Sequence, residues 1–172
     1  MKRNIMSNTY WLVNFSLENF NLSKKRSFDL LGFSKKDNKL TNKIALNDNV
    51  IFYISDLKCF VGTSTVNSKK FYDKKKIWSS DEEEVKFPYR VKLKSTKILP
   101  EKKYISGYDV APSLNYVKRW APEDWYLALL SPVHIISHSD FEIISHGIEN
   151  SLKGNTSKLS LKKKTRKNRK KK

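Results

Sequence analysis

The sequence predicts a single α+β domain built on a strongly curved mixed sheet, either open or partly closed into a barrel, with short flanking helices. The chain has 172 residues, which suits one domain with a sizeable core, and it contains no internal repeat. Its strand-like segments are short and alternate with helical stretches. These segments lie near residues 10–15, 50–55, 58–66, 88–97 and 126–136.

The first strand and helix follow from local pattern. Residues 10–15 (YWLVNF) are aromatic and β-branched, which is typical of a strand. Ser16 can cap a short helix over residues 17–22. A basic break at residues 24–26 then separates this helix from the apolar segment 28–33.

The clearest strand covers residues 50–55 (VIFYIS) and follows a turn cluster at 47–49 (NDN). Residues 58–66 (KCFVGTSTV) are predicted to return as its hairpin partner. Gly62 lies inside this partner strand, so we expect a bulge or a close approach of another backbone there.

The segment 88–95 (PYRVKLKS) alternates apolar and basic side chains, which predicts a half-buried strand with one basic face. Arg90, Lys92 and Lys94 are expected on that face, which is either solvated or in contact with a phosphate backbone. Residues 132–136 are predicted to form the last strand. A helix capped by Ser139 is expected to follow and to run to about residue 146.

Charge points to a polyanionic partner. The last fifteen residues carry ten positive charges and no negative one, so this tail is expected to be disordered on its own and to act as an interaction arm. Residues 1–157 are also basic, with 25 basic and 17 acidic side chains. Nucleic acid is the first candidate, an anionic membrane surface the second, and a solubilising tail the third. The tail residues expected to contact phosphates are Lys162, Lys163, Lys164, Arg166, Lys167 and Arg169.

Other features bound the compartment and the domain plan. A single cysteine, Cys59, excludes an internal disulfide framework and fits a reducing environment. The N-terminus shows no signal-peptide pattern, and no apolar run reaches the roughly 18 residues needed to span a bilayer. We therefore expect an intracellular protein, cytoplasmic or associated with a nucleoid or nucleus. The expected plan is a flexible segment 1–8, a domain 9–149 and a basic tail 150–172.

Signals of an enzyme are weak. The five glycines form neither a dinucleotide fingerprint nor a phosphate loop. The three histidines lack metal-ligand spacing with a cysteine or carboxylate, so we expect no metal and no cofactor. The acidic run 81–84 is typical of a solvated loop. What remains is a set of aromatic residues among lysines. Trp78, in a polar stretch, is the leading candidate, because an accessible indole can stack a nucleobase with roughly 1–3 kcal/mol.

Several segments then resemble a known family. They are residues 10–15 (YWLVNF), 46–55 (LNDNVIFYIS), 60–66 (FVGTSTV), 72–73 (YD) and 87–93 (FPYRVKL). In this order and spacing they resemble the EVE domain family, whose pattern is an opening Tyr-Trp strand, a Gly-Asp turn into an aromatic-Tyr-x-Ser strand, and a Val-Gly-x-x-x-Val return. Residues 126–148 are similar to the last strand and helix of that family, so the resemblance covers roughly residues 8–148.

The resemblance implies a PUA-like fold, related to YTH and ASCH domains, with a pocket for a flipped-out and often modified base in DNA or RNA. In the YTH relatives, aromatic side chains form a cage around a methylated adenine. Residues 77–81 are similar to the loop that carries one cage tryptophan, which implies this role for Trp78. The base-binding residues implied in this way are Asn14, Phe15, Phe33, Ser34, Tyr53, Ser55 and Trp78.

Two departures from the family pattern matter. The usual Gly-Asp turn is Asn47-Asp48 here, and asparagine can adopt the same left-handed backbone. The second cage position has Phe33 where the family has tryptophan, so the sequence leaves the exact cage and the preferred modification open.

The leading hypothesis is a non-enzymatic reader, in which the tail and basic body bind phosphates and an aromatic pocket inspects one base. One alternative is an RNA-binding module without selectivity for modified bases. A second alternative is an enzyme that acts on nucleic acid or nucleotides. The sequence leaves the choice between DNA and RNA open.

Overall fold

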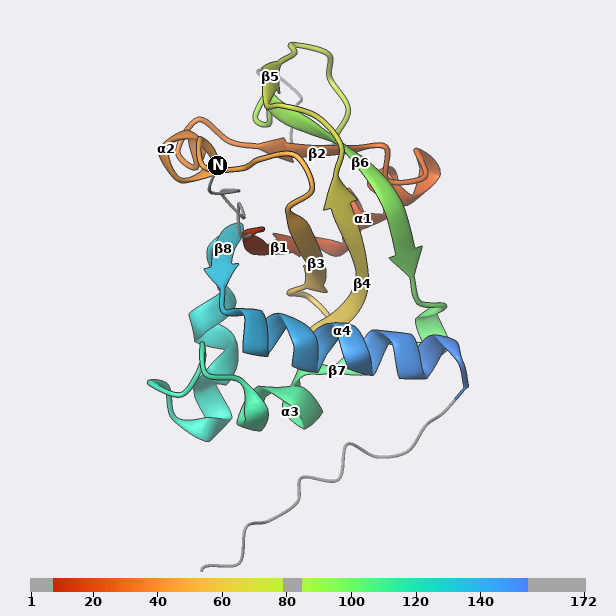
Figure 1. The fold of residues 1–172 in the computed structure, drawn as a ribbon, viewed down its shortest axis with the longest axis vertical. Helices are drawn as coiled ribbons and strands as arrows, with labels where there is room; N and C mark the ends of the chain where they lie inside the picture. The colour runs from red at the N-terminus through yellow and green to blue at the C-terminus, as the bar shows by residue number, and fades with distance from the viewer. Residues whose placement is uncertain (1–7, 79–84, 155–172) are drawn as a thin grey trace, which may run out of the picture.

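The computed structural model describes residues 8–78 and 85–154, and its centre is one curled, mixed sheet (Figure 1). The strands follow the order β2-β6-β4-β3-β1-β8, with β5 beside β6 and β7 beside β4. Only the β1–β3 pair is parallel among the described strands. The predicted fold class, a curved mixed sheet of the half-barrel kind with short helices, is confirmed.

The strands are β1 (Tyr10–Phe15), β2 (Leu30–Phe33), β3 (Asn49–Ile54), β4 (Cys59–Val66), β5 (Phe71–Tyr72), β6 (Tyr89–Ile98), β7 (Ile105–Ser106) and β8 (Val133–Ile136). The helices are α1 (Leu17–Lys25), α2 (Asn38–Thr41), α3 (Gly107–Val110) and α4 (His138–Leu152). Three 3₁₀ segments complete the described elements, namely η1 (Glu101–Lys103), η2 (Ala111–Ser113) and η3 (Pro122–Leu129).

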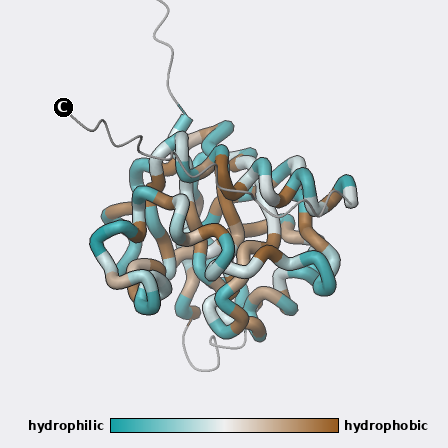
Figure 2. Tube along the Cα trace, turned by 90° about the horizontal axis from the view of Figure 1, so that it is seen from below, coloured by the Kyte–Doolittle hydropathy of each residue, from teal (hydrophilic) through white to brown (hydrophobic). Residues whose placement is uncertain are grey.

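The central strands are buried on both faces, which explains why their sequences are almost continuously apolar. Alternate side chains of a strand point to opposite faces. In β3, therefore, Val50, Phe52 and Ile54 join one core cluster, while Ile51 and Tyr53 join a second. The first cluster lies against α1, and the second lies against α3, η3 and α4. Figure 2 shows hydrophobic stretches running through the interior, with hydrophilic residues at the outer turns.

Several local predictions are confirmed. The hydroxyl of Ser16 accepts a hydrogen bond from the Asn19 N–H (3.2 Å) and caps α1, which extends beyond the predicted helix to Lys25. The β3–β4 hairpin carries a bulge opposite Phe52 and Tyr53. A Cβ at Gly62 would meet the carbonyl oxygen of Lys97 at 2.5 Å, so the close backbone approach expected there is also present.

The turn before β3 anchors the first strand. Asn47 has a φ of 69°, so it adopts the left-handed backbone geometry at the turn where the family has glycine. The buried carboxylate of Asp48 accepts hydrogen bonds from the Trp11 indole and from the Thr9 and Ala45 backbones, each at 2.9 Å. These bonds hold β1 beside β3 and so fix one side of the sheet.

The C-terminal part differs from the prediction in two ways. The strand expected over 126–136 is only β8, because Pro122 opens a 3₁₀ segment through Leu129 that packs Trp125 and Leu129 into the second core. Helix α4 is capped by Ser137, whose hydroxyl accepts from the Asp140 N–H (3.1 Å), and not by Ser139. It then continues to Leu152, so residues 150–152 are helical and do not belong to the tail.

None of the helices within residues 8–78 and 85–154 combines the length and the apolar character that crossing a membrane would require.

Candidate functional site

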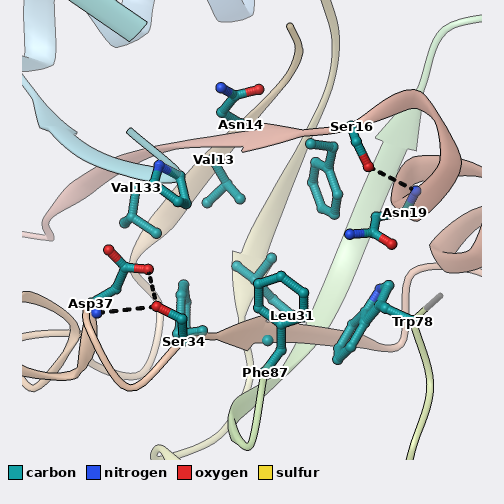
Figure 3. A pocket seen from close by; sticks show the side chains of 14 residues that line it. Val13, Asn14, Ser16, Asn19, Leu31, Ser34, Asp37, Trp78, Phe87 and Val133 are labelled. Carbon is teal, nitrogen blue, oxygen red and sulfur yellow. Dashed lines mark hydrogen bonds between the residues drawn. The ribbon is translucent and has the colours of Figure 1, made fainter. Parts of the chain in front are cut away.

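A pocket of about 140 Å³ lies between β1 and β2, at the edge of the first core (Figure 3). It is lined by Val13, Asn14, Phe15, Ser16, Asn19, Leu31, Gly32, Phe33, Ser34, Asp37, Trp78, Phe87, Pro132 and Val133. An engineered cavity of about 150 Å³ holds benzene. This pocket is therefore of the size that holds a small aromatic molecule. A mostly apolar lining with a few polar groups is typical of small-ligand sites.

Trp78 forms one wall and is firmly held. Its ring lies directly on β2, because a Cβ at Gly32 would meet the indole Cη2 and Cζ3 atoms at 2.6 Å. The indole N–H donates to the Ser23 hydroxyl (3.0 Å) at the end of α1. Phe87 meets the indole edge to face, with ring centroids 5.6 Å apart. Trp78 is thus 6% exposed in spite of its polar sequence surroundings.

Arg90 ties together the two chain segments that supply Trp78 and Phe87. Its fully buried guanidinium donates to the Phe87 carbonyl (3.0 Å) and to the Lys75 carbonyl, and it forms an ion pair with Asp73. It also lies 5.3 Å from the Trp78 ring. The expectation that Arg90 shares the basic outer face of its strand is therefore wrong. Its charge is buried because a carboxylate and two carbonyls satisfy it.

Asp73 is organised for this contact. The pKa of its carboxyl is lowered, first by a hydrogen bond from the Lys75 backbone N–H and then by the nearby Arg90 charge. The carboxylate therefore stays ionised opposite the guanidinium. The ion pair and the carbonyl bonds fix the backbone on both sides of the aromatic wall.

The polar groups of the pocket sit at two ends. At one end the Ser34 hydroxyl donates to Asp37 Oδ2 (2.6 Å), and the Asp37 N–H donates back to the Ser34 oxygen (3.3 Å). At the other end lie Ser16 and Asn19, on the side of Trp78 (Figure 3). Apolar side chains such as Leu31 fill the space between.

Four of the predicted base-binding side chains, Phe15, Phe33, Ser34 and Trp78, line this one pocket together. Phe33 is almost completely buried and also packs in the first core. The prediction missed Phe87, Gly32 and Asp37. An aromatic residue close after the Trp78 loop was the available signal for Phe87, whereas nothing local marks Asp37.

Asn14 also lines the pocket, but its side chain points away from it, on the opposite side of β1 from Val13 (Figure 3). Its amide Nδ2 donates to the Leu129 carbonyl (2.9 Å), and its backbone N–H donates to the Pro132 carbonyl (2.8 Å). Asn14 therefore fastens the pocket edge to the segment before β8. Strand alternation could have indicated this, because adjacent residues of one strand cannot point to the same face.

Tyr53 and Ser55 lie elsewhere. Tyr53 is buried in the second core between Phe60 and Trp125, and this burial raises the pKa of its hydroxyl strongly. The Ser55 hydroxyl donates to the Phe15 carbonyl (3.3 Å), so it supports a pocket residue through the backbone without facing the pocket. Neither side chain lines the cavity.

The predicted phosphate contacts divide between two parts of the chain. Lys92 and Lys94 are exposed on β6, and Lys94 Nζ donates to Asn47 Oδ1 (2.8 Å). Lys35 and Lys36 directly follow the pocket residue Ser34 in the sequence, and both are exposed. The tail residues Lys162, Lys163, Lys164, Arg166, Lys167 and Arg169 lie outside the described residues.

Within the described ranges, no group of three or more histidine, cysteine or acidic side chains is arranged to hold a metal ion. The buried His134 is held by two bonds, with Tyr116 Oη 2.8 Å from Nδ1 and the Ser131 carbonyl 2.7 Å from Nε2. Its role in the described structure is thus explained by these contacts.

The family model described as EVE domain matches residues 9–144. No curated protein matches the chain in sequence. Among solved structures, the YTH domain of Zygosaccharomyces rouxii MRB1 protein in complex with N6-methyladenosine RNA is similar, with a TM-score of 0.61 and 13% identity over 84% of this chain and 88% of that chain.

Two further solved structures share the fold. The Pho92 YTH domain in complex with m6A has a TM-score of 0.56 and 16% identity, over 82% of this chain and 86% of that chain. The YTH domain-containing protein mmi1, solved as a complex with RNA, has a TM-score of 0.57 and 14% identity, over 90% of each chain.

Proposed function

Because this chain belongs to the EVE domain family, we propose that it binds nucleic acid by taking one unstacked base into the pocket between β1 and β2. The base is modified, and the protein acts by binding and not by catalysis. Basic residues outside the pocket hold the phosphate backbone through sequence-independent, salt-sensitive contacts. The pocket supplies discrimination, since only a base that has left the stack can enter it.

The observation that carries this proposal is the convergence of aromatic rings on one open cavity of about 140 Å³. Trp78, Phe87 and Phe33 all line it. An aromatic face contributes roughly 1–3 kcal/mol per stacked base. Alkylation makes a base more apolar and more polarisable, so an aromatic lining favours a methylated base over the plain one.

Two structural neighbours support the ligand class. The MRB1 and Pho92 YTH domains were solved with N6-methyladenosine RNA and with m6A, respectively. They share the fold with this chain at 13% and 16% identity. RNA with a modified base is therefore the first ligand to test, and DNA with the same modification is the second.

The test separates the two parts of the mechanism. Trp78→Ala is expected to reduce the preference for a methylated over a plain oligonucleotide roughly tenfold, because a single stacking contact of this size is lost. Bulk affinity should change little. Deleting residues 158–172 should do the reverse, with weaker binding to every strand and a shallower dependence of log Kd on log salt concentration. Fluorescence anisotropy at several salt concentrations measures both.

If both variants weakened binding to every oligonucleotide by the same factor, the division between pocket and backbone contacts would be wrong. Trp120→Ala is the matched control, because this exposed tryptophan does not line the pocket. It should leave the methylated-to-plain ratio unchanged.

A second candidate is RNA binding without selection for a modified base. Phe33 in place of the family tryptophan favours it, since a smaller ring covers less of the ligand. The mmi1 neighbour, solved with RNA, is compatible with it. Competition between methylated and plain strands at fixed salt distinguishes the candidates, because only the first requires a preference.

A further inference from the structure

One charged side chain, Asp37, lines the pocket among the residues that the structure describes. It lies at the end opposite Trp78, and its carboxylate lies between Ser34 and Val133 (Figure 3). In a protein with a net charge of +18, a carboxylate at this point is unexpected for a site that meets a polyanion. It disfavours entry of a phosphate and leaves the pocket to the base.

The carboxylate is oriented by its neighbour. Oδ2 accepts the Ser34 hydroxyl (2.6 Å), and the Asp37 N–H donates back to the same hydroxyl oxygen (3.3 Å). Oδ1 makes no hydrogen bond to any other described residue. The side chain does not cap α2, since that helix has no side-chain cap bond. The Ser34 hydroxyl thus orients the Asp37 carboxylate at the pocket rim through Oδ2 and leaves Oδ1 without a bond to another described residue.

We propose that Asp37 determines specificity by accepting a hydrogen bond from the exocyclic amino group of the bound base. This inference rests on the proposed function. The ligand class is then an amino-bearing base, such as cytosine or adenine. Uracil and thymine carry a carbonyl oxygen at the corresponding place, and two acceptors facing each other in a partly desolvated site repel.

The substitution Asp37→Asn replaces the free acceptor oxygen by a hydrogen-bond donor of the same size. In Asp37→Asn, the side-chain oxygen can still accept the Ser34 hydroxyl, while the new NH₂ group occupies the place of Oδ1. The pocket rim then offers a donor, which fits a carbonyl and opposes an amino group. Because the Asp37 side chain caps no helix, the change leaves α2 intact.

A pyrimidine series tests the proposal while keeping the ring constant. The full-length protein is titrated with single strands of identical flanks whose central base is cytosine, N4-methylcytosine, N4,N4-dimethylcytosine or uracil. The number of amino N–H donors falls from two to one to none, and uracil places an acceptor there. The wild type should bind the first two roughly tenfold more tightly than the last two, the ratio expected for one charge-assisted hydrogen bond.

Asp37→Asn should lose or reverse this ratio and should keep the wild-type dependence on salt. Asp109→Asn, an exposed residue on α3, changes the net charge equally and should behave as wild type. Circular dichroism melting checks that both variants fold. A ratio that is the same in Asp37→Asn and wild type, with Trp78→Ala still reducing the preference for the N4-methylcytosine strand over the cytosine strand, would overturn the role of Asp37 alone. If no pocket variant affected any central base, the proposed function itself would fail.

Discussion

Two tryptophans of this molecule line cavities in different ways. Trp78 borders the pocket of about 140 Å³, and Trp125 borders a larger one of about 240 Å³ beside Trp120. Both rings lie against a glycine, Gly32 and Gly107, where a Cβ would come within 2.6 and 2.0 Å of the indole. What differs is how each ring is held.

Trp125 is surrounded by other rings, with Tyr53, Tyr108 and Tyr126 at centroid distances of 6.2, 5.4 and 6.2 Å. Its buried indole N–H has no hydrogen-bond partner within the described ranges. Trp78 instead has a hydrogen bond to Ser23 and the buried Arg90 beside its face. The ring of Trp78 is thus held in part by polar contacts, and the ring of Trp125 by packing against other rings.

The two cavities also differ in the polar side chains that line them. The Trp78 pocket holds Ser34, Asp37 and Asn19, which can orient a ligand. Lys118 is the one charged side chain that lines the larger cavity among the described residues. The proposed ligand site is therefore chosen by its convergent hydrogen-bonding groups and not by its size.

The largest expected loss of stability comes from replacing Trp125. Trp125→Ala should lower the free energy of unfolding by about 3–5 kcal/mol, because it removes a ring from the centre of the second core. Trp78→Ala should cost less, since Trp78 lies at the edge of the first core and is not part of that cluster, whereas Trp125 belongs to the second. Urea unfolding followed by far-UV circular dichroism measures both. Equal losses would mean that Trp78 is as much a core residue as Trp125.

Removing the charge of Arg90 should destabilise the part of the protein around Trp78. Arg90→Met is expected to cost about 2–3 kcal/mol, because Asp73 and two carbonyls lose their buried partner while Asp73 keeps some solvent contact. The control Arg26→Met breaks an exposed pair with Asp29 and should cost less than about 1 kcal/mol.

Fluorine NMR of 5-fluorotryptophan-labelled protein locates the Arg90 effect. The Trp78 signal should shift or broaden in Arg90→Met, while the Trp125 signal stays as in the wild type. A change confined to Trp125 would contradict the assignment of Arg90 as the residue that positions Trp78.

The smallest expected effect concerns His134, behind the pocket rim. Burial lowers the pKa of its imidazole, so below about pH 6.5 the unfolded state binds a proton that the folded state resists. The free energy of unfolding should therefore decrease as the pH is lowered below about 6.5, by at most about 1.4 kcal/mol per pH unit. The Asp37 charge acts in the opposite direction and raises this pKa.

Two variants test whether His134 lowers stability at acidic pH. His134→Gln should remove this part of the pH dependence, and Asp37→Asn should make the loss below pH 6.5 slightly steeper. Urea unfolding between pH 5.5 and 7.5 gives the slopes. A slope that is unchanged in His134→Gln would assign the acid sensitivity to other groups.

Local pattern was sufficient for β1, the β3–β4 hairpin and the Ser16 cap, since each depends on neighbouring residues. The site was predictable where the family motif names residues on the correct face, as for Phe33 and Trp78. It was not predictable for Arg90, because alternation places it on the outer face, and two of the groups that satisfy its buried charge, Asp73 and the Lys75 carbonyl, lie seventeen and fifteen residues earlier. Tyr53 belongs to the motif but, by strand alternation, faces the other core.

Arg90 also has a consequence for how this fold can diversify. Its guanidinium donates to the carbonyls of Lys75 and Phe87, so one side chain holds the backbone beside Trp78 and at Phe87. Exchanges of other side chains that line the pocket can then alter what a ligand meets without shifting the indole of Trp78. One buried arginine thereby lets the lining of the pocket change while the position of its tryptophan stays the same.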